Sequence, residues 1–131
     1  KLDTESGSLP IFIKYEAGHD GDRFLNPGEI EWFSKNNRSL KSNEFRWLLD
    51  GTERTPEWQN RHFVPIFIRR KAEEQEKSYY FVGSAVALDD VRASVNPGED
   101  GSESKVVIST LKLIKPVDPE LYRHLTGKSA L

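Results

Sequence analysis

The sequence predicts an α+β or mainly β domain, built as a small curved sheet or barrel-like unit with two short helices. Four segments of strand length are rich in β-branched and aromatic residues, and turn-forming stretches separate them. Only two segments combine capping residues with a helical apolar stripe. The 131 residues, 36% of them hydrophobic, fit a single domain over residues 1–131 with its core at about 9–126. Because the chain starts at Lys1 without a Met or an apolar leader, we expect it to be excised from a larger protein.

The first half of the chain contains two predicted strands. Residues 9–15 (LPIFIKY) form the first, and residues 62–70 (HFVPIFIRR) form the second. Pro65 lacks the N–H that a sheet ladder needs, so we expect the second strand at a sheet edge or at a bulge. Residues 18–28 and the stretch from 51 to 62 are predicted to be loops.

Two more strands are predicted in the second half. The polar residues 71–77 form a hairpin connection to a long strand over 78–88. Gly83 marks a bulge or a close backbone approach in that strand. A turn-rich exposed loop over 96–104 then leads to the fourth strand, residues 105–114, where apolar and polar residues alternate.

Capping residues mark the two predicted helices. The first covers residues 43–50, with Ser42 as its N-cap and Gly51 as its left-handed terminator. The second follows an Asp cap, begins at Pro119 and ends before Gly127. We expect the second helix to close one end of the sheet.

Composition excludes several classes of function. The chain has no Cys, which excludes a disulfide framework and a thiolate site and makes a cytoplasmic location the expectation. The longest apolar stretch, residues 63–68, is far shorter than the roughly 20 residues of a membrane-spanning helix. None of the common catalytic motifs occurs, and the three His residues lack metal-ligand spacing. We therefore expect no enzyme, no cofactor, no metal and no membrane partner.

Charge is unevenly distributed along the chain. The formal net charge is −2, from 19 Lys and Arg against 21 Asp and Glu. Residues 32–71 nevertheless carry nine Lys and Arg against four Asp and Glu, between two acidic flanks. A basic middle third indicates a surface that faces a polyanion, and ordinary scatter of surface charge is the alternative.

The segment 32–44 (WFSKNNRSLKSNE) is the most informative in the sequence. Lys35, Arg38 and Lys41 are three residues apart, and Ser and Asn residues lie between them. Phosphate oxygens accept hydrogen bonds from both kinds of donor, and the neighbouring Trp32 and Phe33 could stack on an unpaired base. The alternative is that the aromatic residues belong to the core and the loop is merely solvated. The predicted DNA-binding residues are Trp32, Ser34, Lys35, Asn36, Asn37, Arg38, Ser39, Lys41, Arg46, Arg69, Arg70, Tyr79 and Tyr80.

Adjacent residues on a strand point to opposite faces of the sheet. Only one of Arg69 and Arg70 can therefore join a given basic patch. The same holds for Tyr79 and Tyr80, of which we expect one in the core and one at the site.

Four segments together resemble a known family: residues 24–44 (FLNPGEIEWFSKNNRSLKSNE), 64–71 (VPIFIRRK), 79–83 (YYFVG) and 113–122 (LIKPVDPELY). The family is a domain of unknown function at the C-terminus of bacterial superfamily-2 helicases, which are DEAD/DEAH or type III restriction-like and often carry a phospholipase-D-type nuclease. The resemblance covers most of residues 10–125. It implies a DNA-processing or restriction and defence context, with helicase and nuclease domains in cis, and it implies no catalytic residue.

These observations favour a noncatalytic DNA-binding module that grips phosphates and reads specific or modified bases of a duplex. Trp32, Tyr79 or Tyr80 would stack on a base flipped out of the duplex. A second hypothesis is a protein-docking domain that links the helicase to its nuclease or to a partner, through strand 62–70 and exposed tryptophans. A third is a metal-dependent nuclease built on the acidic turn at 19–22.

Overall fold

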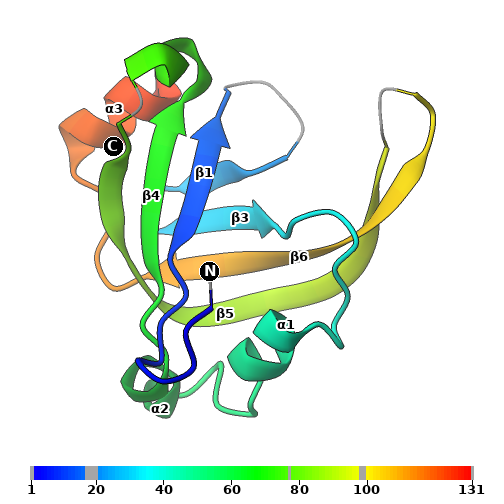
Figure 1. Cartoon of the computed structure of the whole chain (residues 1–131). Helices are drawn as coiled ribbons and strands as arrows, with labels where there is room; N and C mark the ends of the chain where they lie inside the picture. Colours follow the sequence, from blue (N-terminus) through cyan, green and yellow to red (C-terminus); the bar gives the residue numbers. More distant parts are fainter. Residues whose placement is uncertain (1, 17–20, 77, 98–99, 131) are drawn as a thin grey trace.

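One mixed six-stranded sheet, curled into a half-barrel, carries the fold in the computed structural model (Figure 1). The structure describes residues 2–16, 21–76, 78–97 and 100–130. Within these ranges the strands are β1 (Ile11–Tyr15), β2 (Arg23–Asn26), β3 (Glu29–Phe33), β4 (Pro65–Arg70), β5 (Tyr80–Pro97) and β6 (Glu103–Leu113). The helices are α1 (Asn43–Leu48), α2 (Pro56–Arg61), the 3-10 helix η1 (Lys71–Glu76) and α3 (Pro119–Thr126). The predicted α+β, mainly β class with a curved sheet is thus confirmed.

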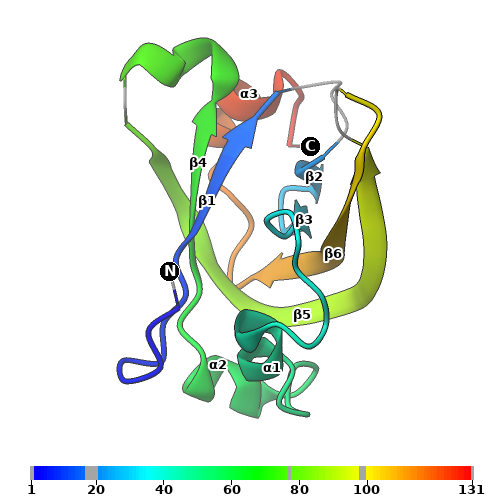
Figure 2. The ribbon, with the colours of Figure 1, turned by 45° about the vertical axis from the view of Figure 1, so that its right-hand side comes forward.

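The strands follow the order β1-β4-β5-β6-β3-β2, and only the β1 and β4 pair is parallel. Strand β5 is 18 residues long and pairs first with β4 and then with β6. Its register slips beside Gly83, near Val86 and around Asp90, and such bulges bend a strand. Figure 2 shows β5 curving so that the arm of β4 and β1 faces the arm of β6, β3 and β2. The predicted irregularity at Gly83, whose φ is 134°, is confirmed.

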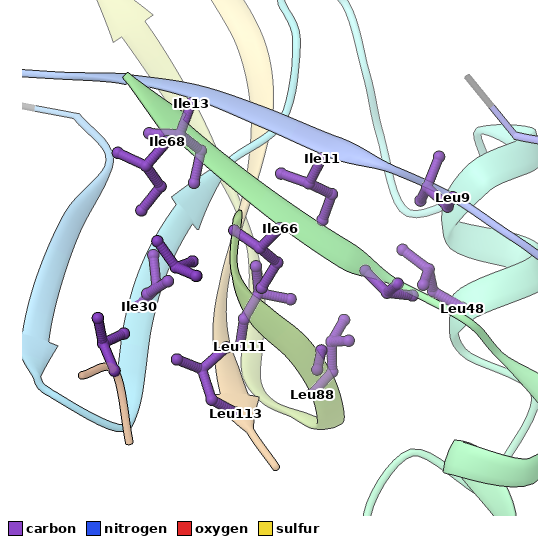
Figure 3. Packing of buried hydrophobic residues seen from close by; sticks show 14 of the residues in the cluster. Leu9, Ile11, Ile13, Ile30, Leu48, Ile66, Ile68, Leu88, Leu111 and Leu113 are labelled. Atoms are coloured by element: carbon purple, nitrogen blue, oxygen red, sulfur yellow. The ribbon is translucent and has the colours of Figure 1, made fainter. Parts of the chain in front are cut away.

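The core fills the concave side of the sheet (Figure 3). In β1, Ile11 and Ile13 are buried while Phe12 and Lys14 between them are exposed, as the period of a strand requires. Ile66 and Ile68 of β4 are fully buried next to them. Burying each such side chain contributes about 1.5–3 kcal/mol, so the β1 and β4 arm is held mainly by apolar contact with the opposite arm.

Helix α3 closes one end of the half-barrel as predicted. The carboxylate of Asp118 accepts a hydrogen bond from the Leu121 N–H, and Gly127 ends the helix with a φ of 73°. Ser42 stands at the N-cap position of α1, but its hydroxyl makes no cap bond because it accepts the Ser39 N–H instead. Helix α1 ends at Leu48, two residues earlier than predicted.

Helix α2 lies in a stretch that the sequence predicts to be loop. It begins at Pro56 and contains the fully buried Trp58, whose indole N–H donates to the Leu48 carbonyl at 2.8 Å. Its six residues bury a single side chain, which is too little for a helical period to be visible in the sequence. No helix in the described ranges has the length and apolarity to cross a bilayer.

Two boundary predictions were wrong. The predicted loop over 18–28 contains strand β2, which pairs with β3, while residues 18–20 of that loop lie outside the described part of the chain. For the strand that carries Pro65, the second of the two predicted positions is confirmed. Strand β4 lies between β1 and β5 rather than at a sheet edge, and Pro65 is its first residue, next to a bulge. Strand β5 continues to Pro97, where it still pairs with Glu103, so the predicted loop over 96–104 is shorter than expected.

Candidate nucleic-acid interface

The basic segment leaves β3 at a buried anchor, Ser34. Its N–H donates to the Val107 carbonyl at 2.9 Å, and its hydroxyl accepts the Val107 N–H at 2.8 Å. The same hydroxyl donates to the Lys35 carbonyl. Ser34 therefore ties the segment to β6 from inside the protein, and this placement does not suit the predicted contact with DNA.

Short hydrogen bonds then fold residues 36–42 into turns. Asn37 has a left-handed φ of 64°, which Asn tolerates better than most residues. The Ser39 hydroxyl accepts the Lys41 N–H at 3.2 Å, and the exposed Asn36 accepts a hydrogen bond from Asn96 at 3.3 Å. These predicted contact residues shape the loop, and the loop in turn presents its lysines to solvent.

The cations of the segment gather around one surface depression of about 750 Å³, here called the basic hollow. Lys35, Arg38 and Lys41 line it, and Glu44 is the carboxylate among its described lining residues. Glu44 accepts a hydrogen bond from Arg38 Nε at 2.7 Å, so the salt bridge uses one of the five guanidinium N–H groups. The hollow is positively charged overall and offers several donors.

Two further cations lie near the segment but outside the residues that line the hollow. Arg46, predicted as a phosphate contact, is exposed on the last turn of α1. Lys105 of β6 is exposed, and its carbonyl accepts the Arg38 N–H at 3.2 Å. Lys105 was not predicted because it is 67 positions after Arg38 in the sequence. Only the curl of the sheet places β6 beside the loop.

A second depression of about 350 Å³, the aromatic pocket, lies between β1 and β3 and shares Lys35 and Glu44 with the basic hollow. Phe12, Trp32 and Phe33 are the aromatic residues among those that line it. The remaining lining residues are Leu9, Pro10, Ile11, Asp22 and Ser34. The two depressions are therefore parts of one continuous site.

Trp32 is half-buried in this pocket. Its ring stacks on the fully buried Phe45 of α1, with centroids 5.6 Å apart and an interplanar angle of 26°. Trp32 thus belongs partly to the core, as the alternative interpretation expects, and also lines a pocket, as a stacking residue must. Phe12 was not predicted, since nothing in the sequence shows that β1 lies opposite β3.

Asp22 is one of two carboxylates that line the aromatic pocket, and the other, Glu44, pairs with Arg38. The Asp22 Oδ1 accepts the Phe33 N–H at 2.6 Å. Burial raises the pKa of this carboxyl from 3.8 to about 6, against the opposing effect of that hydrogen bond. Among the described residues no Lys, Arg or His forms an ion pair with Asp22, so the charge is held in a partly dry pocket without a counter-ion.

The remaining predicted residues lie elsewhere. Arg69 is buried on the outer face of the sheet, with its guanidinium 4.7 Å from the centroid of the Tyr79 ring. Arg70 and Tyr80 lie beside α3, where Arg70 pairs with Glu73 at 3.5 Å. The structure therefore does not bring Arg69, Arg70, Tyr79 and Tyr80 together with the basic hollow.

An exposed row of aromatic side chains crosses the outer face of β1, β4 and β5. Phe12 and Phe67 stack at 5.1 Å, and Phe67 and Phe81 are 5.5 Å apart. Phe12 is 58% exposed and Phe81 56%, which is unusual for such large apolar side chains. Tyr79 contacts Phe12 at 5.2 Å and extends the row, here called the outer aromatic face.

Only part of the acidic turn at 19–22 belongs to the described residues. His19 and Asp20 lie outside the described residues. In the described ranges, no three His, Asp or Glu side chains gather as a metal site would require. Asp22 itself faces the aromatic pocket.

The fold and the site together define an α+β half-barrel domain with a basic hollow joined to an aromatic pocket. Residues 1–125 match the profile of DUF3427, a domain of unknown function, and the chain belongs to this family. The match confirms the coarser part of the resemblance seen in the sequence, a domain of unknown function. No curated protein matches the chain.

Proposed function

We propose that this domain is a noncatalytic DNA-binding module whose basic hollow holds phosphates of the backbone. The observation that carries the proposal is the composition of the hollow, in which Lys35, Arg38 and Lys41 face a single described carboxylate, Glu44. Arg38 can bind a phosphate while it remains paired with Glu44, because its other N–H groups are available by number. Lysines act as point charges that attract the polyanion over a Debye length of about 8 Å.

In this proposal the aromatic pocket recognises a DNA base. A base flipped out of a duplex would stack against Trp32 rather than against Tyr79 or Tyr80. Unstacking costs a few kcal/mol, and stacking of about 1–3 kcal/mol per base offsets much of it. Such a pocket suits recognition of a specific or a modified base.

The resemblance to helicase-associated domains supports the biological setting of the proposal. In that setting, helicase and nuclease domains in cis process DNA in the cytoplasm, within a restriction or defence system. A noncatalytic reader would direct that activity to particular sites.

Fluorescence anisotropy tests the proposal directly. The domain is titrated with unmodified, hemimethylated and fully methylated duplexes and with single strands, at two salt concentrations. Each lost phosphate contact should reduce the slope of log K against log salt by roughly one. Lys41→Ala should show this reduction on every DNA, whereas the control Lys115→Ala, at an exposed position after β6, should not. Equal slopes for the two variants would refute the role of the hollow.

A protein-docking domain is the second candidate, and the outer aromatic face favours it. Phe12, Phe67 and Phe81 expose apolar rings of the kind found at the centre of protein interfaces. A complex made through this face should be nearly insensitive to salt and should weaken in Phe81→Ser. A complex with DNA through the hollow should be strongly salt-sensitive and unaffected by Phe81→Ser.

A further inference from the structure

We infer that the aromatic pocket takes a single nucleobase whose edge presents an amino group, and that the Asp22 carboxylate accepts a hydrogen bond from that group. The inference rests on the proposed function, because it takes the phosphates of the same strand to lie in the basic hollow. It adds the chemical class of base and the residue that selects it.

The shape of the pocket fits a flat ring. Its volume of about 350 Å³ lies at the lower end of the range of about 300–1,000 Å³ for small-ligand sites. Residues of β1 and of β3 line the pocket, so its two walls come from opposite arms of the sheet. The Trp32 ring stacks on the buried Phe45 ring, and this contact fixes the position of Trp32 in the absence of a ligand.

The connection to the hollow fits a nucleotide. Lys35 lines both depressions, so a base in the pocket leaves its sugar-phosphate at the boundary that Lys35 occupies. Glu44 lines both as well, but its Oε1 accepts a hydrogen bond from Arg38 at 2.7 Å. Lys35 therefore remains at the boundary as the cation that would contact the phosphate.

Asp22 is oriented for reading an N–H donor. The Phe33 N–H fixes Oδ1 at 2.6 Å, which leaves Oδ2 as the second acceptor of the carboxylate. Burial without a described counter-ion destabilises the charge, and it raises the pKa of the group to about 6. An N–H donor from a ligand would offset the cost of burying the charge. At pH 8, above this pKa, the carboxyl is ionised and can only accept hydrogen bonds.

This chemistry separates the bases by their exocyclic groups. Adenine and cytosine carry an amino group where thymine carries a carbonyl, and a carboxylate oxygen attracts the first and repels the second. Asp22→Asn should invert the preference. The amide oxygen must stay at the Phe33 N–H, so the amide NH₂ replaces Oδ2 and turns an acceptor into a donor.

Duplexes with one bulged nucleotide provide the test, since a bulged base needs little energy to leave the stack. The probes are identical except that the bulge is deoxyadenosine or the purine nucleoside that lacks the amino group. At pH 8 the wild-type domain should bind the deoxyadenosine bulge about tenfold more tightly, the value of one charge-assisted hydrogen bond. Asp22→Asn should abolish or reverse this preference.

Asp90→Asn is the matched control, because Asp90 is exposed on β5, 72% by side chain, and its φ of 52° suits Asn. It should keep the wild-type preference. Equal wild-type affinity for the two bulges, or a preference that persists in Asp22→Asn, would overturn the inference and leave the proposed function standing. Failure to bind any of these DNAs at low salt would overturn the proposed function itself.

Discussion

Replacing Asp22 by Asn should stabilise the folded domain at neutral pH, and the gain should disappear as the pH falls toward 4. The folded-state pKa of about 6 lies above the ordinary value of 3.8, because burial disfavours the charged form. Between these pH values the folded protein binds more protons than the unfolded chain. The contribution of Asp22 to the stability of the wild type therefore decreases as the pH rises from about 4 to about 6, and it is constant above that range.

The magnitude follows from the size of the shift. A rise from 3.8 to about 6 is about two pKa units, and at about 1.4 kcal/mol per unit it corresponds to a penalty of about 3 kcal/mol. Asp22 is only half-buried, so solvent screening reduces the expected gain to about 1–3 kcal/mol. Asn keeps an acceptor for the Phe33 N–H, and the substitution changes almost no volume.

Urea unfolding of both proteins from pH 4 to pH 8, followed by tryptophan fluorescence, measures the difference. Asp3 and Asp100 have pKa values lowered by hydrogen bonds from Ser6 and Ser102, and they weaken both proteins equally in acid. The free-energy difference between variant and wild type thus isolates Asp22. A difference that is the same at pH 4 and pH 8 would show that the Asp22 carboxyl is not destabilised by burial.

Three further substitutions test the packing around the site by urea unfolding at pH 7. Ser34→Ala should cost about 1–3 kcal/mol, because it leaves the Val107 N–H without its hydroxyl partner, and unchanged stability would contradict the anchor. Asp118→Ala should cost about 1 kcal/mol through loss of the α3 cap, with Asp118→Asn as the tolerated control. Trp58→Phe should cost about 1–3 kcal/mol, since the Leu48 carbonyl loses its buried donor, and a smaller loss would show that the carbonyl finds another partner.

The sequence predicts elements well where one residue pattern decides the structure. Strand β1 and helix α3 were predicted because a run of β-branched and aromatic residues and the Asp-Pro and Gly caps are local signals. Helix α2 and the β2 and β3 hairpin were missed, because each buries so few side chains that tertiary contacts, and not periodicity, define it. In β3 only Ile30 is fully buried among its five residues.

The candidate site also has a part that the sequence predicts and a part that only the tertiary structure reveals. The basic segment is a local pattern, and Lys35, Arg38 and Lys41 do gather around one hollow. The aromatic pocket depends on β1 and β3, which belong to opposite arms of the sheet, so Phe12 and Phe33 have no shared signal in the sequence. Tyr79 and Tyr80 have the right chemistry for stacking but lie on other faces of the domain.

The bend in β5 has a consequence for the width of the aromatic pocket. The pocket walls, β1 and β3, are separated in the sheet by β4, β5 and β6. The distance between the walls is therefore set mainly by the curvature of β5, at the irregularities beside Gly83 and around Asp90, and not by the residues that line the pocket. A small change of the bend angle at these positions produces a larger displacement at the far ends of both arms. Residues far from the ligand would then tune how large a base the domain admits.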